Sequence, residues 1–196
     1  APTRTRLAPS VRCGEATRRI CVCSLARCPE PPPARDAVPI PPGTMAVSND
    51  PAASLEVSAL GSCIGLALVD PGARVAAMAH VFLPSSREDR RSGCDRGKYA
   101  DTVVPTLLEA VLGLGARRDR LNVYLAGGGQ LTGARPPEGA PTIGEANDIA
   151  VRRHLGESGL RVTGSRTGGV VSRSLRVDID GGVVTTRAIG GPLERM

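Results

Sequence analysis

Leu60-Gly-Ser-Cys-Ile-Gly-Leu-Ala-Leu-Val-Asp70 contains the strongest strand signal of this 196-residue chain. Within it, residues 64–69 form an apolar run with the length and side-chain branching of a buried β-strand. The run ends at an Asp-Pro-Gly turn signal, and a second apolar run follows at residues 75–83, where a proline stops it. Two apolar runs separated by such a turn predict a β-hairpin.

Two chemically active side chains lie on this hairpin. Cys63 follows a Gly-Ser turn seven residues before Asp70, and His80 lies eight residues after Gly72. Antiparallel pairing would bring both side chains to the same end of the sheet. A thiol and an imidazole placed there could act as nucleophile and base. A free cysteine is equally at home as a small buried hydrophobe and a strand histidine as a core residue, so both interpretations stay open.

Composition and charge exclude several classes of function. The chain has the length of one domain, and no apolar run is long enough to span a membrane. Aromatic residues make up 2%, so stacking on nucleic-acid bases is not expected. The net charge of +6 is concentrated in residues 1–44, which leaves 18 basic against 16 acidic residues elsewhere. The sequence therefore predicts neither a nucleic-acid partner nor membrane insertion.

Residues 1–44 differ from the rest of the chain. They hold nine of the 17 prolines and four of the six cysteines with no apolar period, so we expect a disordered Arg/Pro-rich tail or a mis-assigned upstream extension. A single domain is then expected over residues 45–196. Three alternatives fit less well: an export signal after Arg18-Arg19, a lipoprotein box ending at Cys28, and a metal site made by the four cysteines, whose spacing lacks paired C-x-x-C knuckles.

Two helices are predicted. Residues 99–114 carry apolar side chains at three- and four-residue intervals. Residues 143–157 follow Thr142, a potential N-cap, with Glu145 as its capping-box partner. The expected buried face of this second helix consists of Ile143, Ala146, Ala150, Val151 and Leu155.

Further strands are expected at residues 55–60, 121–126, 160–163, 175–179 and 183–189. Strands thus outnumber helices and come in hairpins. This pattern predicts an α+β layered sandwich of mainly antiparallel or mixed sheet with two principal helices on one sheet face. The triplet Gly127-Gly128-Gly129 lacks the residues of a phosphate-binding loop, so we expect it to allow a close backbone approach beside the Cys63 turn.

Several short motifs occur together in this chain. They are LGSCIGLALVDP at residues 60–71, AAMAHVFLP at residues 76–84, GKYADT at residues 97–102 and IGEAN at residues 143–147. In their order and spacing they resemble the CheD family of chemoreceptor glutamine deamidases, over roughly residues 55–190. The resemblance implies a fold also found in the catalytic domain of the cytotoxic necrotizing factor toxins.

The resemblance also implies an activity. The protein would convert glutamine side chains of chemoreceptors to glutamate with release of ammonia, with Cys63 as nucleophile and His80 as the base that raises its thiolate fraction. Backbone N–H groups at the turn, that of Cys63 included, would stabilise the oxyanion. Implied partners are the cytoplasmic domains of chemoreceptors and a phosphatase of the CheC type. Neither metal nor cofactor is expected, and a free catalytic thiol suits the cytoplasm.

Two departures from the family pattern stand out. The family has a threonine six residues before the nucleophile, where this chain has Val57, and a late G-G-N motif that ends here in Val170. Ser58 is a candidate third member of the site, although neighbouring residues of a strand face opposite ways. The departures leave a second hypothesis open, a weak or silent adaptor that binds chemoreceptors or CheC. A general cysteine protease or amidase lacks any specificity feature in the sequence.

Overall fold

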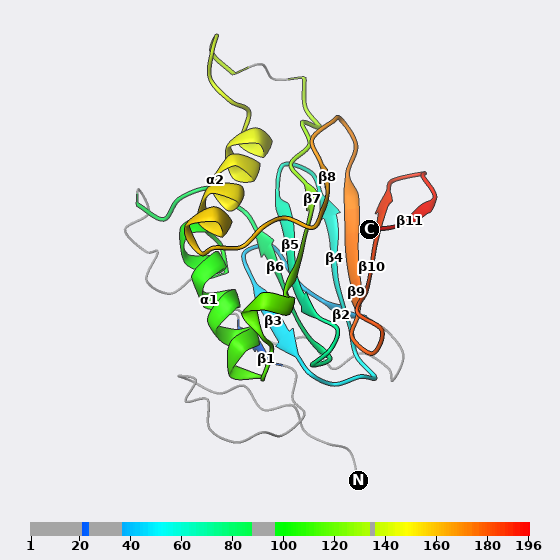
Figure 1. Cartoon of the computed structure of the whole chain (residues 1–196). Helices are drawn as coiled ribbons and strands as arrows, with labels where there is room; N and C mark the ends of the chain where they lie inside the picture. Colours follow the sequence, from blue (N-terminus) through cyan, green and yellow to red (C-terminus); the bar gives the residue numbers. More distant parts are fainter. Residues whose placement is uncertain (1–20, 24–36, 88–96, 134–135) are drawn as a thin grey trace.

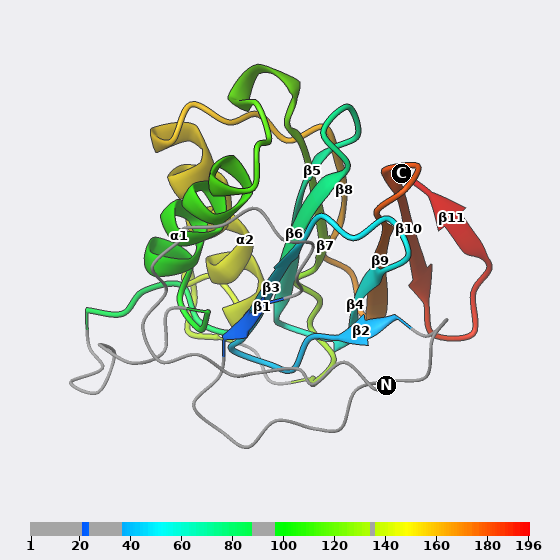
Figure 2. The ribbon, with the colours of Figure 1, turned by 90° about the horizontal axis from the view of Figure 1, so that it is seen from below.

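The computed structural model describes residues 21–23, 37–87, 97–133 and 136–196. They form three layers: one layer of two helices and two layers that are each a β-sheet, shown edge-on in Figure 2. The helices are α1 (Ala100–Gly113) and α2 (Ile143–Glu157), which lie side by side on one face of the first sheet (Figure 1). The predicted α+β layered sandwich with two principal helices is confirmed.

The first sheet has the strand order β1-β3-β6-β5-β7-β8 and the second β11-β10-β9-β4-β2. Most pairs are antiparallel, while β7–β8 and β2–β4 are parallel. In the first sheet the strands are β1 (Cys21–Cys23), β3 (Met45–Ser48), β5 (Ile64–Asp70), β6 (Val75–Val81), β7 (Asn122–Gly127) and β8 (Gly164–Thr167). In the second they are β2 (Val38–Pro39), β4 (Ser54–Leu60), β9 (Arg173–Asp178), β10 (Val183–Ala188) and β11 (Leu193–Arg195).

The predicted hairpin is the centre of the molecule. All residues of β5 and β6 are buried, because the helices cover one face of these strands and the second sheet covers the other. Leu66 and Leu68 pack toward the helices, whereas Ala67 and Val69 pack toward the second sheet. Burial on both faces explains why this stretch is continuously apolar rather than alternating.

The predicted second helix is correct in its bounds and in its cap. Thr142 accepts a hydrogen bond from the Glu145 N–H, and the Glu145 carboxylate accepts one from the Thr142 N–H. Its buried face differs from the expected one. Ile143 is exposed and Ala146 only partly buried, whereas Gly144 and Asn147 are buried. The strand expected at residues 160–163 is also wrong. That segment is a connection, and the strand follows at residues 164–167.

The structure places residues 37–44 within the fold. Val38 and Pro39 pair with β4, and Ile40, which is only 3% exposed, packs in the core between the two sheets. The expected domain boundary at residue 45 therefore falls inside a packed segment. The tail expectation and the alternatives for the N-terminal cysteines otherwise concern residues outside the described part of the chain, apart from the backbone of β1.

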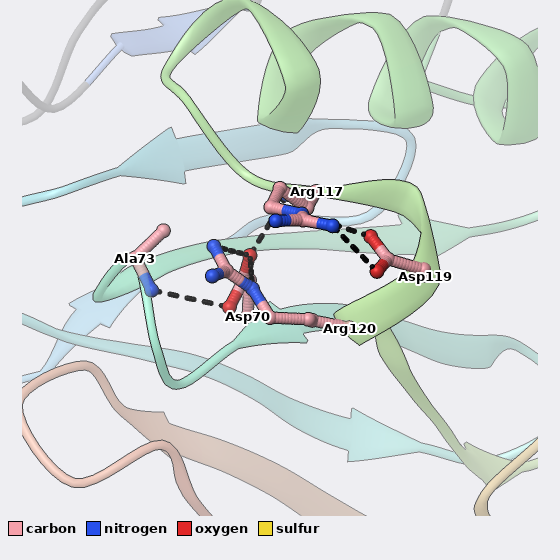
Figure 3. A network of polar contacts seen from close by, with 5 residues as sticks. All are labelled: Asp70, Ala73, Arg117, Asp119 and Arg120. Atoms are coloured by element: carbon pink, nitrogen blue, oxygen red, sulfur yellow. Dashed lines mark hydrogen bonds and ion pairs between the residues drawn. The ribbon is translucent and has the colours of Figure 1, made fainter.

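A buried carboxylate holds the far end of the hairpin. Asp70 is 0% exposed and accepts hydrogen bonds from the backbone N–H of Ala73 and Arg117 and from the Arg120 side chain, at 2.8–3.1 Å (Figure 3). Burial acts to raise the pKa of Asp70, but these hydrogen bonds outweigh it and lower the pKa below its ordinary value of 3.8. The contacts tie the β5–β6 turn to the connection between α1 and β7.

We expect Asp70→Asn to lower the free energy of unfolding by about 2–3 kcal/mol at pH 7, because the amide carries no charge and turns a donor toward other donors. The loss stays below that of a fully buried pair since Arg120 is 42% exposed. The lowered pKa makes this stabilisation present above pH 3.8 and lost as the pH falls further. Urea unfolding at pH 7 measures it. The control is Asp119→Asn, which removes an exposed ion pair with Arg117 and should leave the midpoint unchanged.

Candidate active site

Cys63 lies in the turn that connects β4 of the second sheet to β5 of the first. Its side chain is partly buried and packs against the core between the sheets. The expected close approach of the glycine triplet is confirmed. The Gly128 N–H donates to the Cys63 carbonyl at 2.8 Å and the Gly129 N–H to the Gly61 carbonyl at 2.7 Å. A Cβ atom on Gly127, at φ +104°, would collide with the Cys63 carbonyl oxygen.

His80 and Cys63 lie at the same end of the first sheet, as the hairpin predicted. His80 pairs directly with Gly65, two residues beyond Cys63 along the chain. His80 alternates with Ala79 along β6 and so lies on the Met78 face, which packs in the core between the sheets. Cys63 packs against the same core, so both residues lie on the side covered by the second sheet. His80 is only 2% exposed.

The segment 40–44 fixes His80 at three points. The ring nitrogen Nδ1 lies 3.3 Å from the Ile40 carbonyl oxygen. The His80 carbonyl accepts from the Gly43 N–H, and the His80 N–H donates to the Thr44 carbonyl, both at 2.9 Å. A carbonyl only accepts, so the neutral ring that makes this contact carries its proton on Nδ1 and presents a lone pair on Nε2. Nε2 is buried and has no hydrogen-bond partner, which leaves it available as a base.

The protonation states follow from burial. Burial raises the pKa of the Cys63 thiol above 9.0, an effect that its own backbone N–H offsets only in part. Burial also lowers the pKa of His80 below 6.5, against the opposing contact with the Ile40 carbonyl. At neutral pH the unliganded site therefore holds a thiol and a neutral imidazole. We therefore expect His80 to raise the thiolate fraction of Cys63 only as it takes the thiol proton.

These pKa directions predict the pH dependence of Cys63 alkylation. Because iodoacetamide reacts with the thiolate, the rate at Cys63 should keep rising through pH 9.0 and show no plateau at neutral pH. His80→Ala should leave the shape of that profile unchanged. Site-resolved mass spectrometry separates Cys63 from the other five cysteines. A plateau near pH 7 that His80→Ala removes would instead indicate a preformed thiolate–imidazolium pair.

Ser58, the candidate third member, is not brought to this pair. It is exposed, and its hydroxyl donates to the Glu56 carboxylate at 3.0 Å. Val57 faces the opposite way and is fully buried between the sheets, beside Leu175 of β9. The contact to the His80 ring comes from the Ile40 backbone instead. No side-chain pattern in the sequence signals a backbone acceptor.

Asn147 of α2 is a second residue that contacts the site. Sequence patterns did not indicate this contact. Asn147 lies inside IGEAN, one of the motifs that carry the resemblance, but helical periodicity predicts neither a role for it nor a place on the buried face. It is 0% exposed, and its side-chain amide donates to the carbonyls of Ser62 and Phe82, which flank the Cys63 turn and the end of β6. The available signal for a buried asparagine was its spacing of three residues from Gly144 and four from Val151, which places all three on one face of α2.

The architecture defines an α+β protein with a thiol and an imidazole at one end of a central antiparallel hairpin. The family described as CheD chemotactic sensory transduction matches residues 82–188. The chain belongs to the CheD family. The matched region begins two residues after His80, so this match is independent of Cys63 and His80.

Individual relatives extend the similarity. Chemoreceptor glutamine deamidase CheD of Thermotoga maritima is 37% identical over 151 residues, covering 76% of this chain and 90% of the relative. A probable chemoreceptor glutamine deamidase CheD of Solibacter usitatus is 39% identical over 137 residues, covering 69% and 79%. One from Methanococcus vannielii is 42% identical over 129 residues, covering 65% and 80%. Within the described ranges, no helix combines the length and apolar character needed to cross a bilayer.

Proposed function

We propose that this protein hydrolyses the side-chain amide of glutamine residues on chemoreceptors, yielding glutamate and ammonia. The observation that carries the proposal is the placement of Cys63 and His80 on one face of the hairpin, in a chain whose relatives are named chemoreceptor glutamine deamidases. The site of action would be the cytoplasm, where the receptor helical bundle lies and a thiol stays reduced. A CheC-type phosphatase is the partner we propose beside the receptor.

The chemistry begins from a thiol and a neutral imidazole. His80 Nε2 takes the thiol proton as Cys63 Sγ attacks the amide carbon, and the carbonyl oxygen gains the negative charge. The Cys63 N–H is our candidate donor to that oxygen. The Ile40 carbonyl accepts from Nδ1–H and so stabilises the imidazolium that forms.

The second half regenerates the enzyme. His80 delivers its proton to the amide nitrogen, the C–N bond breaks and ammonia leaves a thioester on Cys63. The same imidazole then takes a proton from water, whose oxygen attacks the thioester carbon. The C–S bond breaks, the thiolate recovers the proton and glutamate is released.

The test is incubation of the full chain with the purified cytoplasmic fragment of a chemoreceptor. We expect ammonia release in step with conversion of specific glutamines to glutamate, followed by site-resolved mass spectrometry. The adaptor hypothesis, which valine in place of threonine at position 57 raises, predicts binding of the fragment without ammonia release. Binding with every glutamine intact would therefore overturn the deamidase proposal.

A further inference from the structure

Asn147 joins the two chain segments that carry the candidate nucleophile and base. Its Nδ2 donates to the Ser62 carbonyl at 2.9 Å and to the Phe82 carbonyl at 3.2 Å. Ser62 immediately precedes Cys63, and Phe82 lies two residues after His80. One fully buried side chain from α2 therefore contacts both segments from the helix side of the sheet.

The two hydrogen bonds of Asn147 lie just beyond the end of the β5–β6 pairing. The β5–β6 ladder ends at the pair Ile64 and Val81, one residue beyond Cys63. Further along, the chain leaves the sheet on both sides, toward the Cys63 turn and toward Phe82. The Asn147 amide bridges the two strands just past the last ladder pair, where backbone pairing has stopped.

The other end of the amide is left unsatisfied. Asn147 Oδ1 is buried and has no hydrogen-bond partner. An unpaired buried acceptor destabilises a protein, so such a group calls for an explanation other than stability. Both Ser62 and Phe82 present acceptors, which fixes the amide orientation with Nδ2 toward them and leaves Oδ1 alone.

We propose that Asn147 is a positioning residue, which holds the Cys63 turn in register with His80 so that Sγ and Nε2 meet when substrate binds. The expected effect of Asn147 on the reaction rate rests on the proposed deamidase function. Reaction rates depend steeply on the placement of reacting groups, and a displacement of about 1 Å can cost roughly a hundredfold. Because Asn147 is fully buried and binds only the two carbonyls, we expect its loss to act on kcat rather than on KM.

The experiment compares Asn147→Ala and Asn147→Asp with Val151→Ala. Aspartate keeps the shape of asparagine but cannot donate to two carbonyls when ionised. Val151, one turn further along α2, is equally buried, and Val151→Ala removes apolar core packing without removing a hydrogen bond to the Cys63 turn. We expect kcat on the receptor fragment to fall at least about tenfold in both Asn147 variants, with KM within about twofold of wild type. Val151→Ala should keep wild-type kcat at a comparable loss of melting temperature.

Alkylation of Cys63 supplies a readout that needs no deamidase activity. A turn released from β6 should change the iodoacetamide rate at Cys63 in both Asn147 variants, but not in Val151→Ala. If the wild type does not deamidate while this contrast holds, the proposed function fails and the positioning role stands. A kcat loss in Asn147→Ala no larger than that in Val151→Ala, with equal alkylation rates, overturns the proposal. So does failure of both Asn147 variants to fold where Val151→Ala folds, because the residue would then serve the fold.

Discussion

Cys63→Ser is expected to lower the rate of glutamine deamidation at least about a thousandfold, equivalent to about 4 kcal/mol in the activation barrier. A serine hydroxyl is a far weaker nucleophile toward an amide, and the buried imidazole of His80, with its lowered pKa, is a poor match for a hydroxyl proton. The substitution hardly changes side-chain volume at a partly buried position. Melting temperature and affinity for the receptor fragment should therefore stay at wild-type values.

The matched control is Ser62→Ala. Ser62 precedes Cys63 in the same turn and contributes its backbone carbonyl, which alanine retains. Ammonia release by Ser62→Ala should match the wild type within about twofold, a difference of less than about 0.5 kcal/mol in the barrier. If Cys63→Ser deamidates at the wild-type rate, another nucleophile is at work. If wild type and Cys63→Ser bind the fragment equally and neither releases ammonia, the protein is an adaptor.

Sequence patterns predicted the parts of the fold that depend on local periodicity. The hairpin of β5 and β6, the apolar face of α1 and the capping box of α2 all follow from apolar spacing or from residue types at fixed offsets. The joint placement of Cys63 and His80 also followed, because it needs only an antiparallel pairing across a short turn. These features require no knowledge of distant contacts.

What periodicity missed are features fixed by long-range contacts. The two-residue strand β2 lies in a proline-rich stretch without alternation and exists by pairing with β4. The sequence predicts a strand at residues 160–163, but Leu160 packs in the core. Thr163 exchanges hydrogen bonds with Val123, and the β7–β8 pairing starts one residue later. The division into two sheets is equally invisible, since a strand pattern does not say which neighbour the strand has.

The backbone atom that contacts the His80 ring could not be predicted from the sequence. Attention to residue types led to Ser58 as the candidate third member, next to Val57, where the family has threonine. The structure provides the Ile40 carbonyl instead, an atom that every residue type carries. The composition of residues 1–44 is that of a disordered tail, so nothing in the sequence indicated that Ile40 lies beside His80.

The second large effect is expected on removal of residues 1–44. A chain beginning at Met45 loses the β2–β4 pairing, the buried Ile40 side chain and the three contacts of segment 40–44 with His80. Burial of an isoleucine alone contributes about 2 kcal/mol. We expect a lower melting temperature and, where the protein remains folded, a kcat about a hundredfold below wild type, since the imidazole loses its orienting acceptor.

Two comparisons separate orientation from stability. A chain beginning at Ala37 keeps β2 and segment 40–44, so its kcat should match that of the full chain. Ile40→Ala keeps the carbonyl that contacts His80 and removes only buried methyl and methylene groups, at a cost of about 2–4 kcal/mol in the free energy of unfolding. If orientation of the His80 ring matters more than stability, Ile40→Ala should have a lower melting temperature but the wild-type kcat. The Met45 chain should then have a low kcat at every temperature at which it is folded. Equal kcat values for the Met45 and Ala37 chains would show that segment 37–44 has no part in catalysis, and the acceptor for His80 Nδ1 would then have to come from elsewhere.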